Sequence, residues 1–475
     1  MKYAEKNKGK VVNLLRFFPS RLIVLLVVGC VLLPLNGCDH FVEVNLPPTQ
    51  LTSEAVFNDR QTANAAMAEI YYQLRANGLL SGRLSGLSAS LGLYADELTY
   101  WGDDSITAFD YHANSILPNN GDVHLLWTTT YNQIYAANSL LEGVASSVAL
   151  STTDKEQLRG EGLFVRALLH FYLTALFGDI PYISTTDYRL NNIAIRVPET
   201  MAYGLVIADL VEASELLGDY PTEGRVRPNQ YAVQALLARV YLYDGKWAEA
   251  ANASSAVLNA TDLYSAGSTA TNFLKDSNST IWHLMPPLDG QNTDEGATFI
   301  FTSGPPPQVS LAATLVDDLE PGDNRKTNWI GTITDGTASW YHVNKYKEQL
   351  NTGTSVEYPI VLRIGEQYLI RAEARARQGE LIGAKEDLDI LRGIAGLGPS
   401  GAVSQEDVLQ AILRERRIEL LTEFGHRFFD LRRFGRLDTV LGATKMGWES
   451  HEKFFPIPEA ELLLNPNLNP QNDGY

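Results

Sequence analysis

Several long stretches of the chain repeat apolar side chains every three or four residues, which is the spacing of one face of an α-helix. Residues 63–74 carry this pattern, with Met67 and Ile70 at two of the apolar positions. Residues 163–177 carry it again, and Gly178 follows directly, as is typical just past the end of a helix. The pattern therefore predicts a mostly α fold.

Two later segments, 238–258 and 372–392, have the same layout of helix, short turn and helix. Gly245 lies in the first turn and Gly379 occupies the equivalent place in the second. Small residues at fixed places let two helices pack closely, as in tetratricopeptide hairpins, whose repeat is about 34 residues. We expect such hairpins to form the scaffold.

Residues 259–345 lose the helical periodicity and are rich in Gly, Asn, Thr, Asp and Pro. Long irregular segments inside a compact domain are uncommon and often carry function. We therefore expect one helical domain over residues 52–475, with an irregular, loop-rich insert at about 259–345 that carries a ligand site. The insert keeps several large aromatic residues, namely Trp282, Trp329, Trp340 and Tyr341.

The N-terminus combines a basic head, an apolar run and a cysteine. The run from 22 to 35 spans 14 residues. At about 1.5 Å per residue it is too short to cross a hydrocarbon core of about 30 Å as a helix. Cys38 follows at the expected cut site, so residues 1–37 are predicted to be a lipoprotein export signal, with residues 38–51 as a lipidated tether. The alternative is an ordinary secretory peptide that happens to contain cysteines.

The chain is acidic, with a formal charge of −18. Residues 1–37 hold six basic and one acidic side chain, so the mature chain would carry −23. Nucleic acid is excluded as an expected partner because phosphate binding needs a basic face. An anionic bilayer would repel the body of the protein, which leaves the lipid on Cys38 as the membrane attachment. Cys38 would also be the single cysteine of the mature chain, so no intrachain disulfide is expected.

Residues 404–475 begin with a highly charged helix. Glu415, Glu419 and Glu423 are each four residues apart and share one stripe, where like charges repel. Glu419, Glu423 and Asp430 would be the candidates for catalysis, but a hydrolase needs two carboxylates with separated pKa values facing a cleft. We instead expect structural ion pairing, because many arginines lie nearby: Arg416, Arg417, Arg427, Arg432 and Arg433.

This charged segment resembles the C-terminal signature of the SusD/RagB family of outer-membrane nutrient-binding lipoproteins. That signature runs E-R-R-x-E-L, then E-G, R and D-L-x-R, and here Phe424 is inserted between the acid and the glycine. The resemblance covers nearly the whole mature chain. Further matching blocks are Arg166-Ala167, residues 177–181, residues 323–325, Lys345-Tyr346, Arg363 with residues 372–374, and residues 455–475.

The resemblance implies four tetratricopeptide-like hairpins in a curved scaffold, with loops that carry the ligand site. It also implies an outward-facing, lipid-anchored place on the outer membrane and a SusC-like TonB-dependent barrel as partner. Such a pair imports oligosaccharides in many members and peptides or other small nutrients in some. We therefore expect a binding protein and not an enzyme.

Two alternatives stay open from the residues, namely a membrane-anchored glycoside hydrolase and a helical-repeat adaptor that binds protein. An enzyme should show a carboxylate pair free of arginine, and an adaptor should show regular repeats with short loops. The chain has no phosphate-binding loop, nucleotide fingerprint or metal-ligand spacing, so neither a cofactor nor a metal is expected.

Sugars bind to proteins by stacking on flat aromatic rings and by hydrogen bonds to polar side chains. Residues 94–104 mix both types and end in a Gly-Asp-Asp turn. The loop at this place commonly contributes to binding in the resembling family. Trp282 is expected equally in the core, and the alternative for the other aromatic residues is that they pack under loops. The predicted ligand-binding residues are Tyr94, Asp96, Tyr100, Trp101, Trp282, Trp329, Trp340 and Tyr341.

Overall fold

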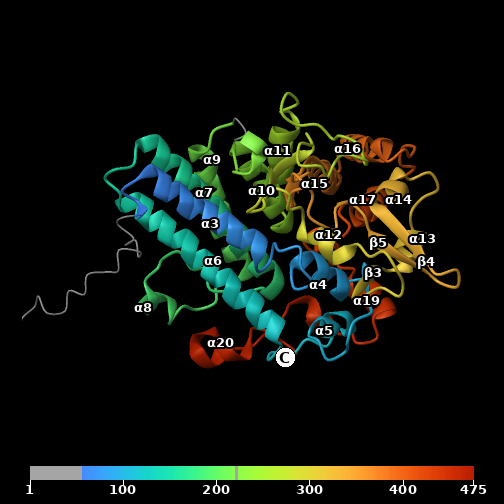
Figure 1. Ribbon diagram of the computed structural model, residues 1–475, viewed down its shortest axis with the longest axis horizontal. Coiled ribbons are helices and arrows are strands. Elements are labelled where there is room, and N and C mark those ends of the chain that lie inside the picture. The colour runs from blue at the N-terminus through green and yellow to red at the C-terminus, as the bar shows by residue number, and fades with distance from the viewer. Residues whose placement is uncertain (1–55, 220–222) are drawn as a thin grey trace, which may run out of the picture. The chain divides into compact units, whose positions relative to one another are not determined.

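Stacked antiparallel helices make up most of the structure, a computed structural model that describes residues 56–219 and 223–475 (Figure 1). These residues belong to a compact unit that spans Thr52–Tyr475. The predicted export signal (1–37), the tether (38–51) and Cys38 lie outside the described residues.

The long helices follow one another through the scaffold, each packed on a neighbour in the stack. The prediction of a mostly α fold with tetratricopeptide-like hairpins is confirmed. The helices are α3 (Arg60–Ala76), α6 (Gly121–Ser146), α7 (Thr152–Phe177), α9 (Glu199–Leu216), α10 (Gln230–Tyr243), α11 (Trp247–Leu258), α15 (Ile364–Arg377), α16 (Leu381–Ile394) and α17 (Gln405–Glu419).

The two hairpins recognised in the sequence are α10–α11 and α15–α16. Gly245 and Gly379 both have left-handed backbone conformations, with φ of +71° and +83°. A side chain disfavours this conformation, which explains why glycine ends the first helix of each hairpin. Ala250 and Ala384, at equivalent places in the second helices, are fully buried. The second helix of one hairpin, α11, packs against the first helix of the other, α15.

Helix α7 forms the centre of the hydrophobic core. From Leu163 onward nearly all of its side chains are buried, and the helix ends at Gly178 as predicted. Shorter helices close the ends and edges of the unit: α4 (Leu87–Tyr94), α5 (Ala108–Ala113), α8 (Tyr188–Asn191), α12 (Asp294–Phe299), α13 (Ala313–Asp317), α14 (Asn324–Trp329), α18 (His426–Arg433), α19 (Leu437–Thr444), α20 (Glu459–Leu464), and the 3₁₀ turns η2 (Glu223–Arg225), η3 (Ser450–Lys453) and η4 (Pro466–Leu468).

Two small antiparallel sheets complete the fold. One pairs β2 (Thr280–His283) with β6 (Ile360–Arg363), and the other has the order β1 (Leu98–Tyr100), β3 (Val309–Leu311), β5 (Ser339–Val343), β4 (Ile330–Thr334). The expectation that residues 259–345 are irregular is therefore wrong in part, because the segment supplies β2 to β5. These strands have three to five residues each, which is too short for alternation to stand out in the sequence.

Candidate ligand-binding site

The four-stranded sheet sorts the predicted aromatic residues onto two faces. Successive side chains of a strand point to opposite faces. Leu98 is buried in the core and pairs with Leu311, which in turn pairs with Tyr341. Tyr100 and Tyr341 therefore lie on the core-facing side, and both pack against the hydrophobic core. The neighbours of these two tyrosines, Trp101 and Trp340, lie on the outer face.

Trp101 and Trp340 meet on this outer face. Their ring centroids are 6.4 Å apart and their planes cross at 83°. Trp101 is 43% exposed, and its Nε1 donates a hydrogen bond to Ser310 Oγ at 2.9 Å. The Trp340 ring covers Gly304, where an added Cβ would lie 2.0 Å from the ring. We call Trp101, Trp340, Ser310 and Gly304 the tryptophan platform.

The loops that flank the platform are polar and acidic. Residues 102–105, 302–308 and 334–339 contain no lysine or arginine. Asp103 accepts a hydrogen bond from the Ser105 backbone N–H at 2.8 Å, and this bond lowers the pKa of the Asp103 carboxyl. The platform is thus a pair of crossed aromatic rings flanked by loops that carry aspartates but no lysine or arginine.

Three of the predicted ligand-binding aromatics lie in the core, which removes them from the site. Tyr94 is fully buried, meets Phe428 and Phe455 edge to face, and donates a hydrogen bond to the Glu452 carbonyl at 3.1 Å. The whole of α4 is buried around it. Its ring therefore has no face open to a ligand.

Trp282 and Trp329 are enclosed in the same way. Trp282 packs edge to face with Phe164 at 5.0 Å, inside β2, whose four residues are all buried. Trp329 ends α14 and donates from Nε1 to the Thr269 carbonyl at 2.6 Å, while Phe273 covers it. The prediction that Trp282, Trp329 and Tyr94 contact ligand is corrected by their burial.

Asp96 serves the fold and not an open surface. Its carboxylate accepts hydrogen bonds from Arg427 Nε at 2.7 Å and from Arg417 Nη2 at 2.8 Å. Burial alone would raise the pKa of Asp96, but its hydrogen bonds and ion pairs with the two arginines lower it. Asp96 thereby ties the segment leading into β1 to α17 and α18.

Sequence reasoning missed Ser310 and Gly304. Ser310 fixes the Trp101 ring, and Gly304 leaves the space that Trp340 fills. Neither residue type carries a binding signal by itself, and both roles depend on strand pairing between distant segments.

The acids of the C-terminal signature form a buried ion-pair network. The predicted structural pairing is confirmed, but the predicted partners are wrong, because the cations come from upstream elements that sequence spacing does not reveal. Those cations lie in matching blocks of the family resemblance, so the separate blocks converge in space. The pairs are Glu415–Arg325 at 2.5 Å, Glu419–Arg325 at 3.1 Å, Glu419–Arg363 at 2.6 Å, Glu423–Arg363 at 2.7 Å and Glu423–Lys345 at 2.5 Å.

The arginines predicted to pair with these glutamates have other roles. Arg416 and Arg433 bind the two oxygens of Asp430, Arg417 and Arg427 bind Asp96, and Arg432 donates to the Ala175 carbonyl. Burial would raise the pKa values of Glu419, Glu423 and Asp430, but the adjacent cations lower them. None of these three carboxylates is therefore poised to donate a proton.

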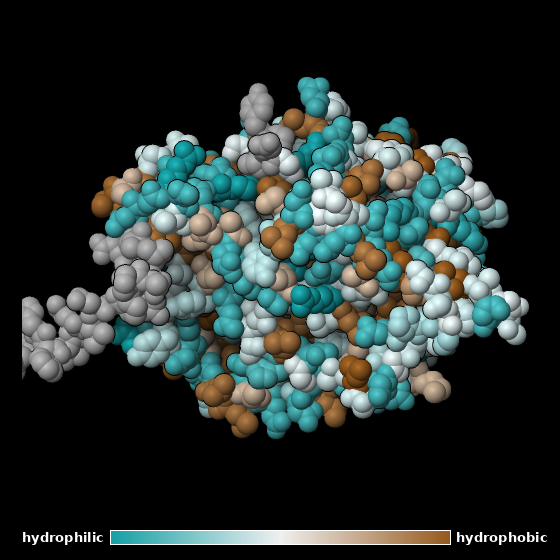
Figure 2. All heavy atoms as spheres, in the orientation of Figure 1, coloured by the Kyte–Doolittle hydropathy of each residue, from teal (hydrophilic) through white to brown (hydrophobic). Residues whose placement is uncertain are grey.

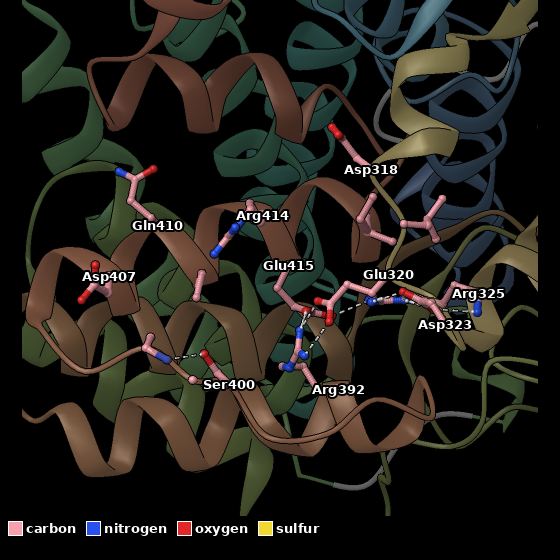
Figure 3. Close-up of a pocket in the computed structure, with 15 residues that line it drawn as sticks. Asp318, Glu320, Asp323, Arg325, Arg392, Ser400, Asp407, Gln410, Arg414 and Glu415 are labelled. Atoms are coloured by element: carbon pink, nitrogen blue, oxygen red, sulfur yellow. Dashed lines mark hydrogen bonds and ion pairs between the residues drawn. The ribbon is translucent and has the colours of Figure 1, made fainter.

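A cavity of about 540 Å³ lies beside this network (Figure 3). Arg392 points toward both Glu320 and Glu415 in the close-up, and its Nη1 is 2.6 Å from Glu320 and 3.6 Å from Glu415. Asp407 forms a capping box with Ser404 at the start of α17. The acids of the cavity are thus matched by arginines or by helix caps, and Glu415 is held between two cations.

Two further findings concern the described residues as a whole. Within residues 56–219 and 223–475, no three His, Cys, Asp or Glu side chains are placed to hold a metal ion. In the same ranges, no helix combines the length and apolar character needed to cross a bilayer.

Stacked helical hairpins that carry two small sheets are the fold of solved structures of the SusD superfamily. Residues 51–242 match a SusD-like family described as "Starch-binding associating with outer membrane", and residues 318–475 match the SusD_RagB family, described as "SusD family". The chain belongs to the SusD/RagB family.

Known proteins resemble the chain over nearly its full length. SusD-like protein P2 of Formosa agariphila is 26% identical, and the match covers 94% of this chain and 98% of that protein. A SusD-like protein from Bacteroides fragilis has the same fold, with a TM-score of 0.76, 18% identity, and coverage of 89% of this chain and 98% of that one. A structure described as a laminarin binding SusD-like protein has a TM-score of 0.72, 24% identity, and coverage of 87% and 99%.

Proposed function

We propose that the chain is a cell-surface nutrient-binding lipoprotein that captures neutral oligosaccharides on the tryptophan platform. In this proposal it passes them to a SusC-like TonB-dependent barrel of the outer membrane. The observation that carries the proposal is the pair of crossed indole rings at 6.4 Å on the outer face of the sheet.

The geometry of the platform suits a sugar chain. A pyranose ring presents an apolar face of C–H groups, which gains by lying on an aromatic ring. Two rings that cross at 83° offer faces in two directions, so successive sugar units of a bent chain can each meet one. Because Ser310 and the Gly304 backbone hold the two rings, little side-chain freedom is lost on binding.

The charge around the platform favours a neutral ligand. Asp103, Asp104 and Asp335 are exposed in the flanking loops. Hydrogen bonds from backbone N–H groups lower the pKa values of Asp103 and Asp335, so both are ionised at neutral pH. An anionic polysaccharide would meet these carboxylates with no arginine or lysine in the same loops to offset them.

The comparisons support the same class of ligand. The matched family is described as starch-binding and associated with the outer membrane, and one structural relative is described as laminarin binding. Starch and laminarin are both neutral glucans. Delivery to a barrel and attachment through acylated Cys38 rest on the family resemblance and on the N-terminal sequence.

The proposed role is non-catalytic. The carboxylates of the C-terminal signature are paired with arginine or lysine, and the pKa values of Asp103 and Asp335 at the platform rim are lowered by hydrogen bonds from backbone N–H groups. Hydrolysis of a glycosidic bond needs one acid with a raised pKa facing the sugar. The platform residues supply stacking and hydrogen bonding and no such acid.

Isothermal titration calorimetry with the full chain in detergent tests the proposal. The panel contains laminari-, malto-, cello- and xylo-oligosaccharides, with oligogalacturonate and alginate oligosaccharides as anionic members. We expect at least one neutral member to bind, with the anionic members weaker, and expect Trp101→Ala and Trp340→Ala to reduce that binding. Trp247→Ala changes a half-buried tryptophan outside the platform and is the matched control. Binding by neutral sugars that survives both platform variants unchanged would contradict the proposal.

A further inference from the structure

A second groove of about 540 Å³ lies between α6, the segment that follows α7, and α20 with η4, where hydrophobic atoms gather over α20 (Figures 1 and 2). Its volume falls within the range of about 300–1,000 Å³ that is usual for small-molecule sites. The platform lies on other parts of the chain, namely the end of β1, the Gly304 loop, β3 and β5, so the groove is a separate feature.

Hydrogen bonds between its walls fix the shape of the groove. Tyr131 of α6 donates from its hydroxyl to the Pro181 carbonyl at 2.8 Å. On the other side, Asn465 donates from Nδ2 to the Ala194 carbonyl at 2.8 Å. The three walls are therefore tied together, and the groove does not depend on a ligand to form.

Aromatic rings line the α6 wall. Trp127, Tyr131 and Tyr135 are spaced four residues apart and so share one face of the helix. The Trp127 and Tyr131 rings are 4.9 Å apart and are packed into the protein. Tyr135, one turn further along, is 52% exposed, and among the described residues its ring meets no other aromatic ring. It offers a free ring face at the mouth of the groove.

Amide groups supply the polar part of the lining. Asn132 and Asn192 are exposed beside Tyr135, and within the described residues neither side-chain amide hydrogen-bonds to another protein group. Asn191 is held by its Nδ2, which donates to the Thr185 carbonyl at 2.9 Å. A side-chain amide can both donate and accept hydrogen bonds, and so can a sugar hydroxyl. Either group can therefore be the donor when the two meet.

The charge of the lining selects among ligand classes. No lysine or arginine lines the groove, and its single carboxylate, Glu461, lies 3.4 Å from His124 Nε2. A phosphate or a polyanion would find no counter-charge there. A purely apolar segment would bury the unpaired amides of Asn132 and Asn192, which costs free energy. A neutral, hydroxyl-rich ligand with an apolar face satisfies both the amides and the rings.

We propose that this groove, with Tyr135, Asn132 and Asn192 as its contact residues, is a second binding site for neutral oligosaccharide. It does not depend on the platform, because no residue is shared between the two sites. A chain with two sites would hold a long glycan at two points and gain affinity by raising the local concentration of the second segment.

The test uses the full chain in the Trp101→Ala/Trp340→Ala background, which removes the platform. Calorimetry with laminari-, malto-, cello- and xylohexaose should show residual binding, and Tyr135→Ala should weaken that binding at least about tenfold, as loss of one stacking partner does. Tyr188→Ala is the control, since Tyr188 is 69% exposed on α8 and lies outside the groove lining. Asn132→Ala should lower the affinity without altering the fold, because the residue is exposed.

Native mass spectrometry counts the oligosaccharide molecules bound to each chain, independently of calorimetry. The unaltered chain should bind two copies of a short oligosaccharide, and the Tyr135→Ala/Asn132→Ala variant should bind one. Absence of residual binding to every hexaose in the platform-free background would overturn the inference. So would residual binding that Tyr135→Ala leaves unchanged, because the sugar would then bind outside this groove. Failure of the platform proposal would look different, since binding would then persist in full after both tryptophans are removed.

Discussion

Trp101 and Trp340 stand edge to face, with ring centroids 6.4 Å apart, although they come from distant parts of the chain. Strand β3 lies between their strands and connects them. The outer face of this sheet, and not the helical scaffold, thus presents the aromatic surface that the proposed function requires.

Removing either ring should weaken glycan binding. Trp101→Ala and Trp340→Ala should each cost about 1–3 kcal/mol of binding free energy. This loss combines the stacking interaction with the apolar surface that the ring buries on binding. A double-mutant cycle should show coupling of about 0.5–1.5 kcal/mol, because the rings touch each other. Calorimetry gives the affinities and urea unfolding checks the fold. Strictly additive losses would show that the two rings act separately.

Gly304 should control the position of Trp340. A Cβ at Gly304 would lie 2.0 Å from the Trp340 ring, so Gly304→Ala must displace that ring. We expect weaker oligosaccharide binding by calorimetry with a smaller change in thermal stability. The matched control is Gly353→Ala, because a Cβ there meets nothing within 4 Å. Equal affinities for the two variants would contradict the assigned role of Gly304.

Asp96 should prove structural. Asp96→Asn removes the charge that pairs with Arg417 and Arg427, whose side chains are about nine-tenths buried. Breaking a buried ion pair from one side costs about 3–5 kcal/mol, so urea unfolding should show a loss of this order. Asp103→Asn, at an exposed carboxylate, should leave the unfolding free energy nearly unchanged. A stable Asp96→Asn variant with weakened glycan binding would instead support the sequence-based prediction that Asp96 contacts the ligand.

Glu97 should make the stability of the protein fall as pH rises. Burial, and secondarily the adjacent Asp96 carboxylate, raise the pKa of Glu97 to about 7. Between the ordinary pKa of 4.5 and this value, the folded chain keeps a proton that the unfolded chain releases. The stabilising contribution is therefore complete below pH 4.5 and is lost as pH rises through 7.

The variant Glu97→Gln isolates this effect. Its amide oxygen can still accept from the Thr422 N–H, as the carboxylate does at 3.3 Å, but it cannot ionise. Relative to the unaltered chain, its unfolding free energy should rise by on the order of 3 kcal/mol between pH 4.5 and 8. Urea unfolding across that pH range gives the difference. A difference that stays constant with pH would contradict the assignment.

Cys38 should carry the membrane anchor. Cys38→Ala removes the thiol that an acyl group would occupy, so the protein should move from the membrane fraction to a soluble periplasmic form. Cell fractionation and intact-mass analysis measure the change. Retention of the variant in the membrane fraction would show that another element anchors the chain.

The helical scaffold was open to prediction because its signals are local. The apolar spacing before Gly178 and the matched glycines Gly245 and Gly379 each describe a few consecutive residues. The family resemblance added that the matching sequence blocks follow one another along the chain in the family's order. The ion-pair network was foreseen from Glu419 and Glu423, but their partners depend on tertiary packing.

The site was predicted only in part, for the same reason. Trp101 and Trp340 are two of the large aromatic residues that the sequence offers as ligand contacts, and the structure brings their rings together on the outer face of the sheet, but nothing local separates them from Tyr94 or Trp282. Helix α4 is buried on all sides and β2 at every position, so neither shows an amphipathic pattern. Recognition of β5 as a strand would have placed Trp340 and Tyr341 on opposite faces.

A crystal structure of the chain with the neutral oligosaccharide that calorimetry finds tightest tests the central claim most directly. The account predicts a sugar ring stacked on Trp101 or Trp340, with further units following the outer face of the sheet. Occupancy of the charged cavity beside Glu415 with both indole rings left bare would contradict it.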